Sequence, residues 1–374
     1  MKSIDLKVEK VIQPIGEFYI TQIDSKSLYS MAKADIMRIS NSEDTIYEGI
    51  QRELDFKKVE KIENYLRSKE ATFPNSIILN LNKNHLIELN DDIMKIRITE
   101  NTFSIIDGQH RLEGLRNFEH KFGLSCSIFV GLSINEQSRI FVTINSEQTK
   151  VNSSVSVYQE YEDTLYTPRK FAAELAVAFA MDKESKWFET IKLRGVKDEI
   201  SERGTISLSA FYRPILDLIY SDDDYYEIRT LLQDNNNSLR EVTNHFHYNL
   251  KYEDSNKYIL WELYTENNKK LLYKILNNYF DSFAEVLSKD WDLDNNKSIL
   301  KKTTGYNAMM MLFKDLYFIG FKNGTLTKEF FMTYIEKLKV LNGKVSSGNF
   351  EASGLQSSRN MYLKFKELIF NGKN

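Results

Sequence analysis

Apolar residues in the first 160 positions are spaced as in short strands and amphipathic helices. The runs at residues 16–23 and 77–81 have the length and composition of strands. Two further runs, at 96–98 and 103–106, flank a polar Glu-Asn pair, and we predict that they form a hairpin. The run at 126–132 completes the set of predicted strands.

Helical spacing separates these strands. Within residues 52–68, large apolar side chains recur every three or four positions, which predicts an amphipathic helix. These side chains are Phe56, Val59, Ile62 and Leu66. A second predicted helix starts directly after Asp107-Gly108, and a third covers 136–144. Residues 1–160 therefore predict a compact α+β domain.

From about residue 165 onward the pattern is almost entirely helical. The segment 171–181 is apolar on nearly every side, which is typical of a buried helix. The other predicted helices lie at 208–220, 258–287, 308–319, 328–341 and 357–370. We predict an α+β fold in which residues 1–160 form the mixed domain and residues 161–374 form a mainly helical domain.

Composition and charge limit the classes of function. The chain has 374 residues, of which 42% are hydrophobic and 28% are charged, as in a folded globular protein with a sizeable core. Its net charge is −3 and its pI is near 6.1. A protein that coats DNA without sequence preference would be basic, so any contact with nucleic acid must depend on a local patch.

The cysteine content and the apolar runs bear on compartment and chemistry. The single cysteine, Cys126, excludes an intramolecular disulfide and a cysteine-based zinc cluster, and its position predicts a buried strand residue. The N-terminal residues lack an apolar signal core, and no run reaches transmembrane length, so we expect a cytoplasmic protein with no membrane partner. Zincin, nucleophile-elbow and P-loop patterns are absent from the sequence.

The most informative motif is Asp107-Gly108-Gln109-His110-Arg111, between a strand-like run and a helical one. Glycine lets the backbone approach a ligand closely, and the first turn of a helix attracts anions. Arg111 would add a planar fork of donors that matches phosphate oxygens. The alternative is a tight turn of purely structural importance, with His110 in the core.

Two other features could serve the same anion. Asn145 and Gln148 are three residues apart on one predicted helical face, and their amides could read a base edge or ligate a metal. They could equally mark an ordinary helix end. Arg52 could reach the anion bound by Arg111, or it could form a simple surface ion pair with Asp55.

A basic run beside aromatic residues is the candidate DNA-binding segment. It consists of Lys192, Arg194, Lys197 and Arg203. Basic side chains with nearby aromatics suit a nucleic-acid backbone. Interleaved acidic residues also allow a solvated loop, and the Gly/Ser-rich segment 344–359 is a second candidate for phosphate contact.

The motif at 107–111 resembles the DGQHR-domain family, which is named for these five residues and includes DndB-like proteins of DNA phosphorothioation systems. Other segments also resemble blocks of this family, so the resemblance covers nearly the full length of the chain. These segments are Arg52-x-x-Asp55, 73–78, 141–151, 187–195, 204–207, 303–305 and 354–357.

The family is similar at its motif to the ParB/sulfiredoxin superfamily, whose members bind nucleotides in a glycine-arginine box. This similarity implies a ParB/sulfiredoxin-like fold for the first domain. It also implies that Gly108, Gln109, His110 and Arg111 surround the phosphates of ATP or another nucleotide with Mg²⁺. Asn145 and Gln148 would lie near the ligand. Gln109 stands where sulfiredoxin has its reactive cysteine, which excludes sulfinic-acid reduction because an amide supplies no thiolate.

The resemblance implies two functions. The first is a nucleotide-binding regulator that binds DNA at the promoters of modification genes, together with other DNA-modification proteins. The alternative is an ATP-dependent hydrolase or phosphotransferase that takes part in DNA modification. In that enzyme Asp107 and His110 would be catalytic, with Asp107 as a metal ligand or as the base that orients water.

Overall fold

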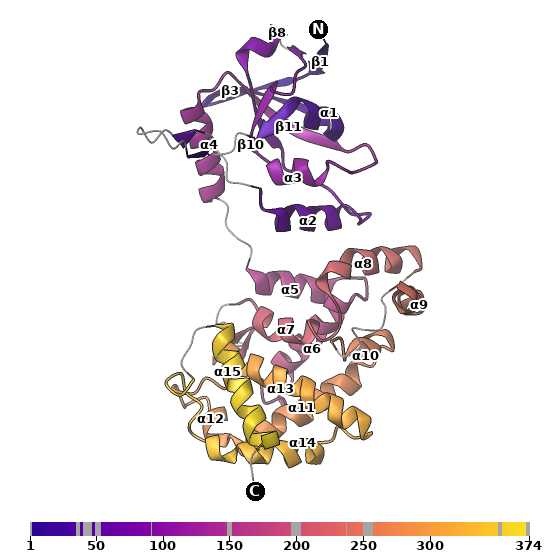
Figure 1. Ribbon diagram of the computed structural model, residues 1–374, viewed down its shortest axis with the longest axis vertical. Coiled ribbons are helices and arrows are strands. Elements are labelled where there is room, and N and C mark those ends of the chain that lie inside the picture. The colour runs from indigo at the N-terminus through magenta and orange to yellow at the C-terminus, as the bar shows by residue number, and fades with distance from the viewer. Residues whose placement is uncertain are drawn as a thin grey trace. The chain divides into compact units, whose positions relative to one another are not determined.

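The computed structural model describes residues 2–34, 38–39, 47–48, 54–90, 92–147, 152–195, 203–236, 238–249, 257–350 and 354–371. The chain divides into two units, Met1–Lys150 and Val151–Asn374 (Figure 1). The boundary suggested by the sequence, at residue 160, falls inside helix α5 (Ser153–Glu162), which packs against α6 and α7 of the second unit. The fold is α+β as predicted, with sheets in the first unit and a mainly helical second unit.

Six strands form the main sheet of the first unit. Their order across the sheet is β2 (Glu9–Gln13), β3 (Gly16–Asp24), β11 (Gly123–Val130), β7 (Ile77–Leu81), β10 (Phe103–Asp107) and β4 (Ala32–Ala34). The central strands β11 and β7 are parallel, whereas β7 and β10 are antiparallel. This order places the end of β10, where the motif begins, directly beside the start of β7.

Helices cover both faces of this sheet. Side chains of α1 (Ser25–Met31) and α3 (Gln109–Gly114) share a core cluster with alternate residues of the central strands. Helix α4 (Ile134–Glu147) packs on the opposite face, where Ile140 contacts Ile106 and Phe129. Helix α2 (Phe56–Tyr65) packs against α3 (Figure 1).

The predicted hairpin between residues 96–98 and 103–106 is wrong. β9 (Ile93–Arg97) pairs instead with β1 (Ser3–Lys7) and β8 (Leu86–Leu89) in a separate sheet, and β10 belongs to the main sheet. The buried hydroxyl of Thr102 donates to the carbonyl of Arg97 at 2.9 Å and accepts from the backbone N–H of Thr99. The polar turn therefore carries the chain from one sheet to the other. Residues Arg38–Ile39 (β5) and Tyr47–Glu48 (β6) form a further short pair.

The second unit is a bundle around one large core. Its helices are α5, α6 (Pro168–Met181), α7 (Leu208–Leu216), α8 (Tyr225–Asp234), α9 (Leu239–Asn249), α10 (Trp261–Thr265), α11 (Lys269–Val286), α12 (Ser288–Trp291), α13 (Thr303–Lys322), α14 (Lys328–Ile335) and α15 (Leu355–Lys366). Its only strands among the described residues are β12 (Ile191–Lys192) and β13 (Ile206–Ser207), which pair in parallel. At the centre, the buried Trp187 ring contacts Phe211, Phe280, Trp291 and Tyr306.

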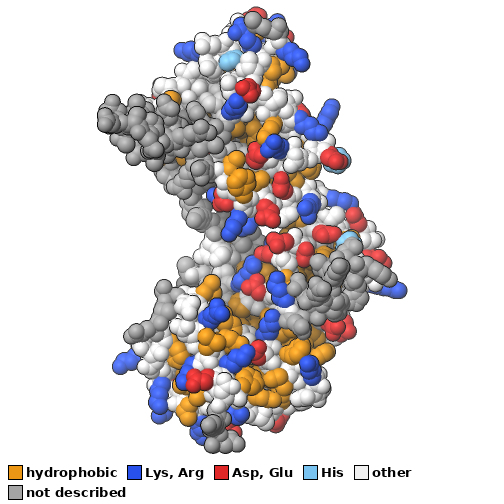
Figure 2. All heavy atoms as spheres, in the orientation of Figure 1, with side chains coloured by type: hydrophobic (Ala, Val, Ile, Leu, Met, Phe, Trp, Pro, Cys, Tyr) orange, Lys and Arg blue, Asp and Glu red, His pale blue; other side chains and the backbone are white. Residues whose placement is uncertain are grey.

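One long predicted helix is interrupted. Residues 258–287 form α10 and α11 because Asn267 takes a left-handed conformation, with φ of 55°, between them. Among the described residues, no helix combines the length and the apolar character that crossing a membrane requires. Figure 2 shows positive and negative side chains interspersed over this face of both units, in keeping with a net charge near zero.

Candidate functional site

The motif forms a sharp turn between β10 and α3. Gly108 has a φ of 103°, a left-handed conformation that L-residues rarely adopt. A Cβ atom there would lie 2.5 Å from Ile77 Cδ1 and 3.1 Å from Arg111 Nη2. Both the backbone angle and the lack of space therefore require glycine, and the turn brings the motif against the start of β7.

Arg111 holds the motif to the segment that precedes β7. Its Nη1 donates to the carbonyl of Asn75 at 2.5 Å, and its Nη2 donates to the carbonyl of Ser76 at 3.2 Å. The same Nη2 forms an ion pair with Asp107 Oδ2 at 2.9 Å. The side chains of Arg111 and Asp107 are 18% and 27% exposed, so the pair remains open to a ligand from solvent.

His110 connects the motif to α2. Its Nε2 accepts a hydrogen bond from the backbone N–H of Asp55 at 3.1 Å, and the Asp55 carboxylate caps α2 by accepting from the N–H of Lys57. A backbone N–H can only donate, so the contact requires an unprotonated Nε2 and places the proton of the neutral ring on Nδ1. Burial of the ring, together with the nearby Lys58, lowers the pKa of His110.

This contact predicts a loss of stability of the first unit in mild acid. The pKa of His110 is lower in the folded protein than in the unfolded chain, where it is about 6.5. The hydrogen bond to the neutral ring therefore stabilises the folded state fully above pH 6.5, and this stabilisation is lost as the pH falls through the folded pKa. We expect a loss of about 1 kcal/mol, the size of one hydrogen bond. In urea unfolding, the stability of His110→Gln should not show this fall in mild acid. The control variant His120→Gln replaces an exposed ring and should show it as the wild type does. Parallel pH profiles for wild type and His110→Gln would refute the assignment.

The other residues predicted for the anion lie in different settings. Gln109 is buried at the first position of α3. Asn145 is exposed on α4, and its Nδ2 donates to the carbonyl of Phe141 in the same helix at 2.8 Å. Arg52 and Gln148 lie outside the described residues. The structure thus groups the motif with two segments that the sequence analysis named as family blocks, through contacts to the carbonyls at 75–76 and to the N–H of Asp55 that it did not predict.

The predicted DNA-binding residues lie beside the starts of two helices. Lys192 pairs in register with Ser207, the residue that caps α7, while Arg194 and Arg203 are exposed. Lys197 lies outside the described residues. Gly195 approaches Asn152, which caps α5: a Cβ atom at this glycine would lie 2.5 Å from the Asn152 amide.

Serine hydroxyls connect these two helix starts. Ser209 Oγ accepts a hydrogen bond from Ser153 Oγ at 2.9 Å and lies 3.2 Å from Ser207 Oγ. Its backbone N–H donates to Ser154 Oγ at 3.3 Å. We call the region formed by Lys192, Arg194, Arg203 and these serines the basic-serine edge. Its segments meet through the β12–β13 pair and through the approach of Gly195 to Asn152.

The candidate metal ligand Asp107 and the single cysteine are also located in the structure. Across the part of the chain that the structure describes, no three His, Cys, Asp or Glu side chains gather as metal ligands, at Asp107 or elsewhere. Cys126 is buried in β11 as predicted, and burial raises the pKa of its thiol to about 12. The thiol therefore stays protonated near neutral pH and is a core residue.

Comparison with known proteins identifies the family. No curated protein and no solved structure matches the chain. The model of the DndB family, described as DNA-sulfur modification-associated, matches residues 6–192, which is half of the chain. The match includes the motif turn, α5, α6 and β12, whereas the similar blocks at 204–207, 303–305 and 354–357 lie beyond it. The chain belongs to the DndB family of DNA-sulfur modification-associated proteins.

Proposed function

We propose that this protein is a DNA-binding regulator of a DNA phosphorothioate modification system, and that its Asp107–Arg111 turn binds the phosphates of a nucleotide. Membership of the DndB family supports the setting. The observation that carries the DNA-binding role is the basic-serine edge, where Lys192 and the exposed Arg194 lie beside the starts of α5 and α7.

The edge offers the groups that usually contact a DNA backbone. Phosphate oxygens accept hydrogen bonds from arginine, lysine, serine and helix N-termini, and such contacts fix a protein on the duplex without reading its sequence. The net charge of the chain is −3, so long-range attraction to DNA must come from a local group of cations. The basic-serine edge provides three described cations for this purpose.

The DNA-binding proposal predicts a loss of affinity in the triple variant Lys192→Ala, Arg194→Ala, Arg203→Ala. We expect affinity to fall at least about tenfold, and the slope of log affinity against log salt to fall by about one for each phosphate contact removed. Fluorescence anisotropy measures both, with a duplex from upstream of the modification genes and a shuffled duplex. Lys270→Ala, at an exposed lysine of α11, is the matched control. Unchanged affinity and slope in the triple variant would contradict the proposal.

The nucleotide proposal rests on the turn. Gly108 allows the sharp turn that starts α3, and Arg111 stands one helical turn from Asp107 with both side chains partly exposed. The residues fit a phosphate better than they fit a bare metal ion. Mg²⁺ would depend on the nucleotide's own phosphates, with Asp107 as one carboxylate ligand, because Mg²⁺ commonly binds through substrate phosphates and one or two carboxylates.

The geometry favours binding over hydrolysis or phosphotransfer. A general base needs a free lone pair near the attacking group. The Nε2 lone pair of His110 is taken by the N–H of Asp55, and the Asp107 carboxylate pairs through Oδ2 with Arg111. Pairing with a cation makes a carboxylate a weaker base. Both candidate catalytic residues therefore have structural partners already, which supports a regulator rather than an enzyme.

A further inference from the structure

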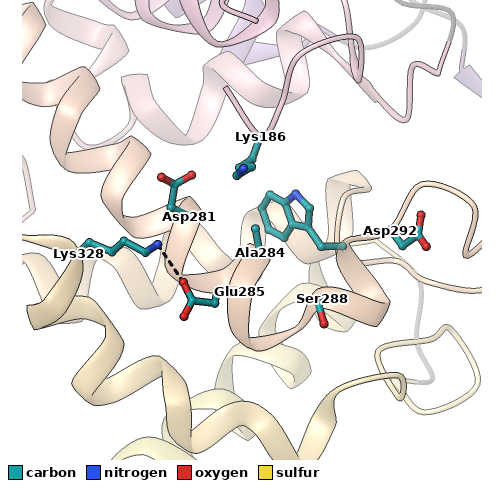
Figure 3. A pocket seen from close by; sticks show the side chains of 8 residues that line it. Lys186, Asp281, Ala284, Glu285, Ser288, Asp292 and Lys328 are labelled. Carbon is teal, nitrogen blue, oxygen red and sulfur yellow. Dashed lines mark ion pairs between the residues drawn. The ribbon is translucent and has the colours of Figure 1, made fainter. Parts of the chain in front are cut away.

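The helical unit contains a cavity of about 390 Å³ that the proposed function does not use. Its walls come from the loop before Trp187, from α11 and α12, and from the start of α14 (Figure 3). The lining residues are Lys186, Asp281, Ala284, Glu285, Ser288, Trp291, Asp292 and Lys328. This volume is in the range of small-molecule sites.

Two lysines, Lys186 and Lys328, line the cavity, and one of them already has an ion-pair partner. Lys328 Nζ pairs with Glu285 Oε2 at 2.9 Å. Lys186, by contrast, has no carboxylate within 4.0 Å of its Nζ among the described residues, although its ammonium faces the carboxylate of Asp281 in Figure 3. A cation and an anion therefore face each other across the cavity without forming an ion pair.

Asp281 is the less satisfied partner. Its Oδ1 is buried and has no hydrogen-bond partner among the described residues, and its Oδ2 accepts only a 3.4 Å contact from Asn277 Nδ2. Burial raises the pKa of this carboxyl, whereas Lys186 and Lys328 oppose the rise. Because Oδ1 has almost no accessible surface, a ligand must approach this half-buried carboxylate at Oδ2. An ammonium group there would replace the weak amide contact of Asn277 with a charged hydrogen bond, and such a ligand would be bound favourably.

The rest of the lining selects the ligand further. Three carboxylates and two ammonium groups repel a polyphosphate, which separates this cavity from the proposed nucleotide site. An acidic group on the ligand would find Lys186. Trp291 and Ala284 are the apolar residues of the lining, and they offer a surface for a short side chain.

We propose that this cavity binds a free α-amino acid, with its ammonium group on Asp281, its carboxylate on Lys186 and its side chain against Trp291. The proposal does not depend on DNA or nucleotide binding, because it concerns a separate site whose ligand bridges two charges that the protein itself leaves apart.

Thermal unfolding of the full chain with each of the twenty amino acids, at about 5 mM, tests the proposal. We expect at least one of them to raise the Tm of the helical unit by about 2 °C or more. n-Propylamine and propionate, which carry one charge each, should not do so. The Kd of the best amino acid, from calorimetry, should rise at least about tenfold in Asp281→Asn and in Lys186→Gln.

Matched variants keep the result interpretable. Lys183→Gln removes an exposed charge from the same loop and should leave the Kd unchanged, while Lys186→Arg should retain most of the binding. Asparagine has nearly the shape of aspartate, so circular dichroism should show a folded Asp281→Asn variant. The proposal is overturned if no amino acid binds, if propylamine binds equally well, or if Asp281→Asn leaves the Kd unchanged.

Discussion

Replacing Arg111 by alanine is expected to weaken nucleotide binding by the DGQHR turn strongly. The guanidinium is the proposed phosphate donor, and a hydrogen bond between charged partners contributes about 1.5–3 kcal/mol, so affinity should fall about 10- to 100-fold. The same change removes the contacts of Arg111 with Asn75, Ser76 and Asp107. We therefore also expect the first unit to lose about 2 kcal/mol of stability.

A thermal-shift screen with ATP, ADP, CTP and GTP in the presence of Mg²⁺ would identify the ligand, and titration would then separate affinity from stability. Arg116→Ala is the matched control, because Arg116 is an exposed arginine nearby that pairs only with Glu113 through its side chain among the described ion pairs. Arg111→Lys should retain charge but lose the fork, and should bind weakly. Equal stabilisation of wild type and Arg111→Ala by the nucleotide would rule out the phosphate role and leave a structural clamp.

The strand–turn–helix form of the motif could be predicted from the sequence. The apolar run at 103–106 ends at Asp-Gly, and helical spacing resumes at Leu112, which matches β10 and α3. The partners of Arg111 and His110 could not be predicted, because they are the carbonyls of residues 75–76 and the N–H of Asp55. Every residue carries these backbone groups, so the sequence holds no signal that singles them out.

Strand partners were the weakest part of the prediction for a related reason. Apolar runs at 96–98 and 103–106 look like the arms of a hairpin, because local alternation shows that two strands exist and not which strands they pair with. β10 bonds to β7 and β4, which are distant in sequence, and β9 bonds to β1 and β8. Thr102 separates the two sheets by satisfying the carbonyl of Arg97 with its own hydroxyl.

The helical unit was easier to anticipate, because buried helices repeat a pattern that depends on their own residues. Helix α6 starts three residues before the predicted 171 and ends at 181, whereas α13 extends the predicted range 308–319 by five residues at its start and three at its end. The break at Asn267 was missed because a left-handed asparagine between two apolar stretches leaves their helical spacing nearly intact. The cations of the basic-serine edge were predicted, because they form a run in the sequence. Its serines were not predicted, because they come from two helix starts that tertiary packing brings together.

The largest stability effect is expected from Arg169→Met in the helical unit. Arg169 Nη1 pairs with Glu160 Oε1 at 3.2 Å, its Nη2 pairs with Asp222 Oδ1 at 3.0 Å, and its Cζ lies 3.4 Å from the centre of the Tyr225 ring. Methionine preserves much of the apolar volume, but it removes the cation that pairs with Glu160 and leaves Asp222 with Arg213 alone among the described ion pairs. Removing one partner of such a network costs about 3 kcal/mol or more, which urea unfolding would measure.

Arg213→Met is the matched control, because Arg213 also pairs with Asp222 but has a side chain that is 53% exposed. Exposed pairs contribute about 1 kcal/mol or less, so this variant should differ little from wild type. If Arg213→Met lost as much unfolding free energy as Arg169→Met, the loss would come from the shared partner Asp222. The burial of Arg169 would then not explain it.

The pH dependence of the deficit separates lost charge from lost packing. In the wild type, burial alone would raise the pKa of Asp222, but Arg169, Arg213 and Tyr220 hold it at about 2, so its contribution is present above the unfolded value near 3.9 and disappears in acid. Without Arg169, the pKa of Asp222 rises from its lowered value, and the pKa of Glu160, which burial already holds above its ordinary value, rises further. Protonation of these carboxyls therefore costs the variant less than the wild type as the pH falls. The deficit of Arg169→Met should therefore shrink between pH 7 and pH 4, whereas a deficit that stays constant over this range would show that packing, and not the buried carboxylates, accounts for the loss.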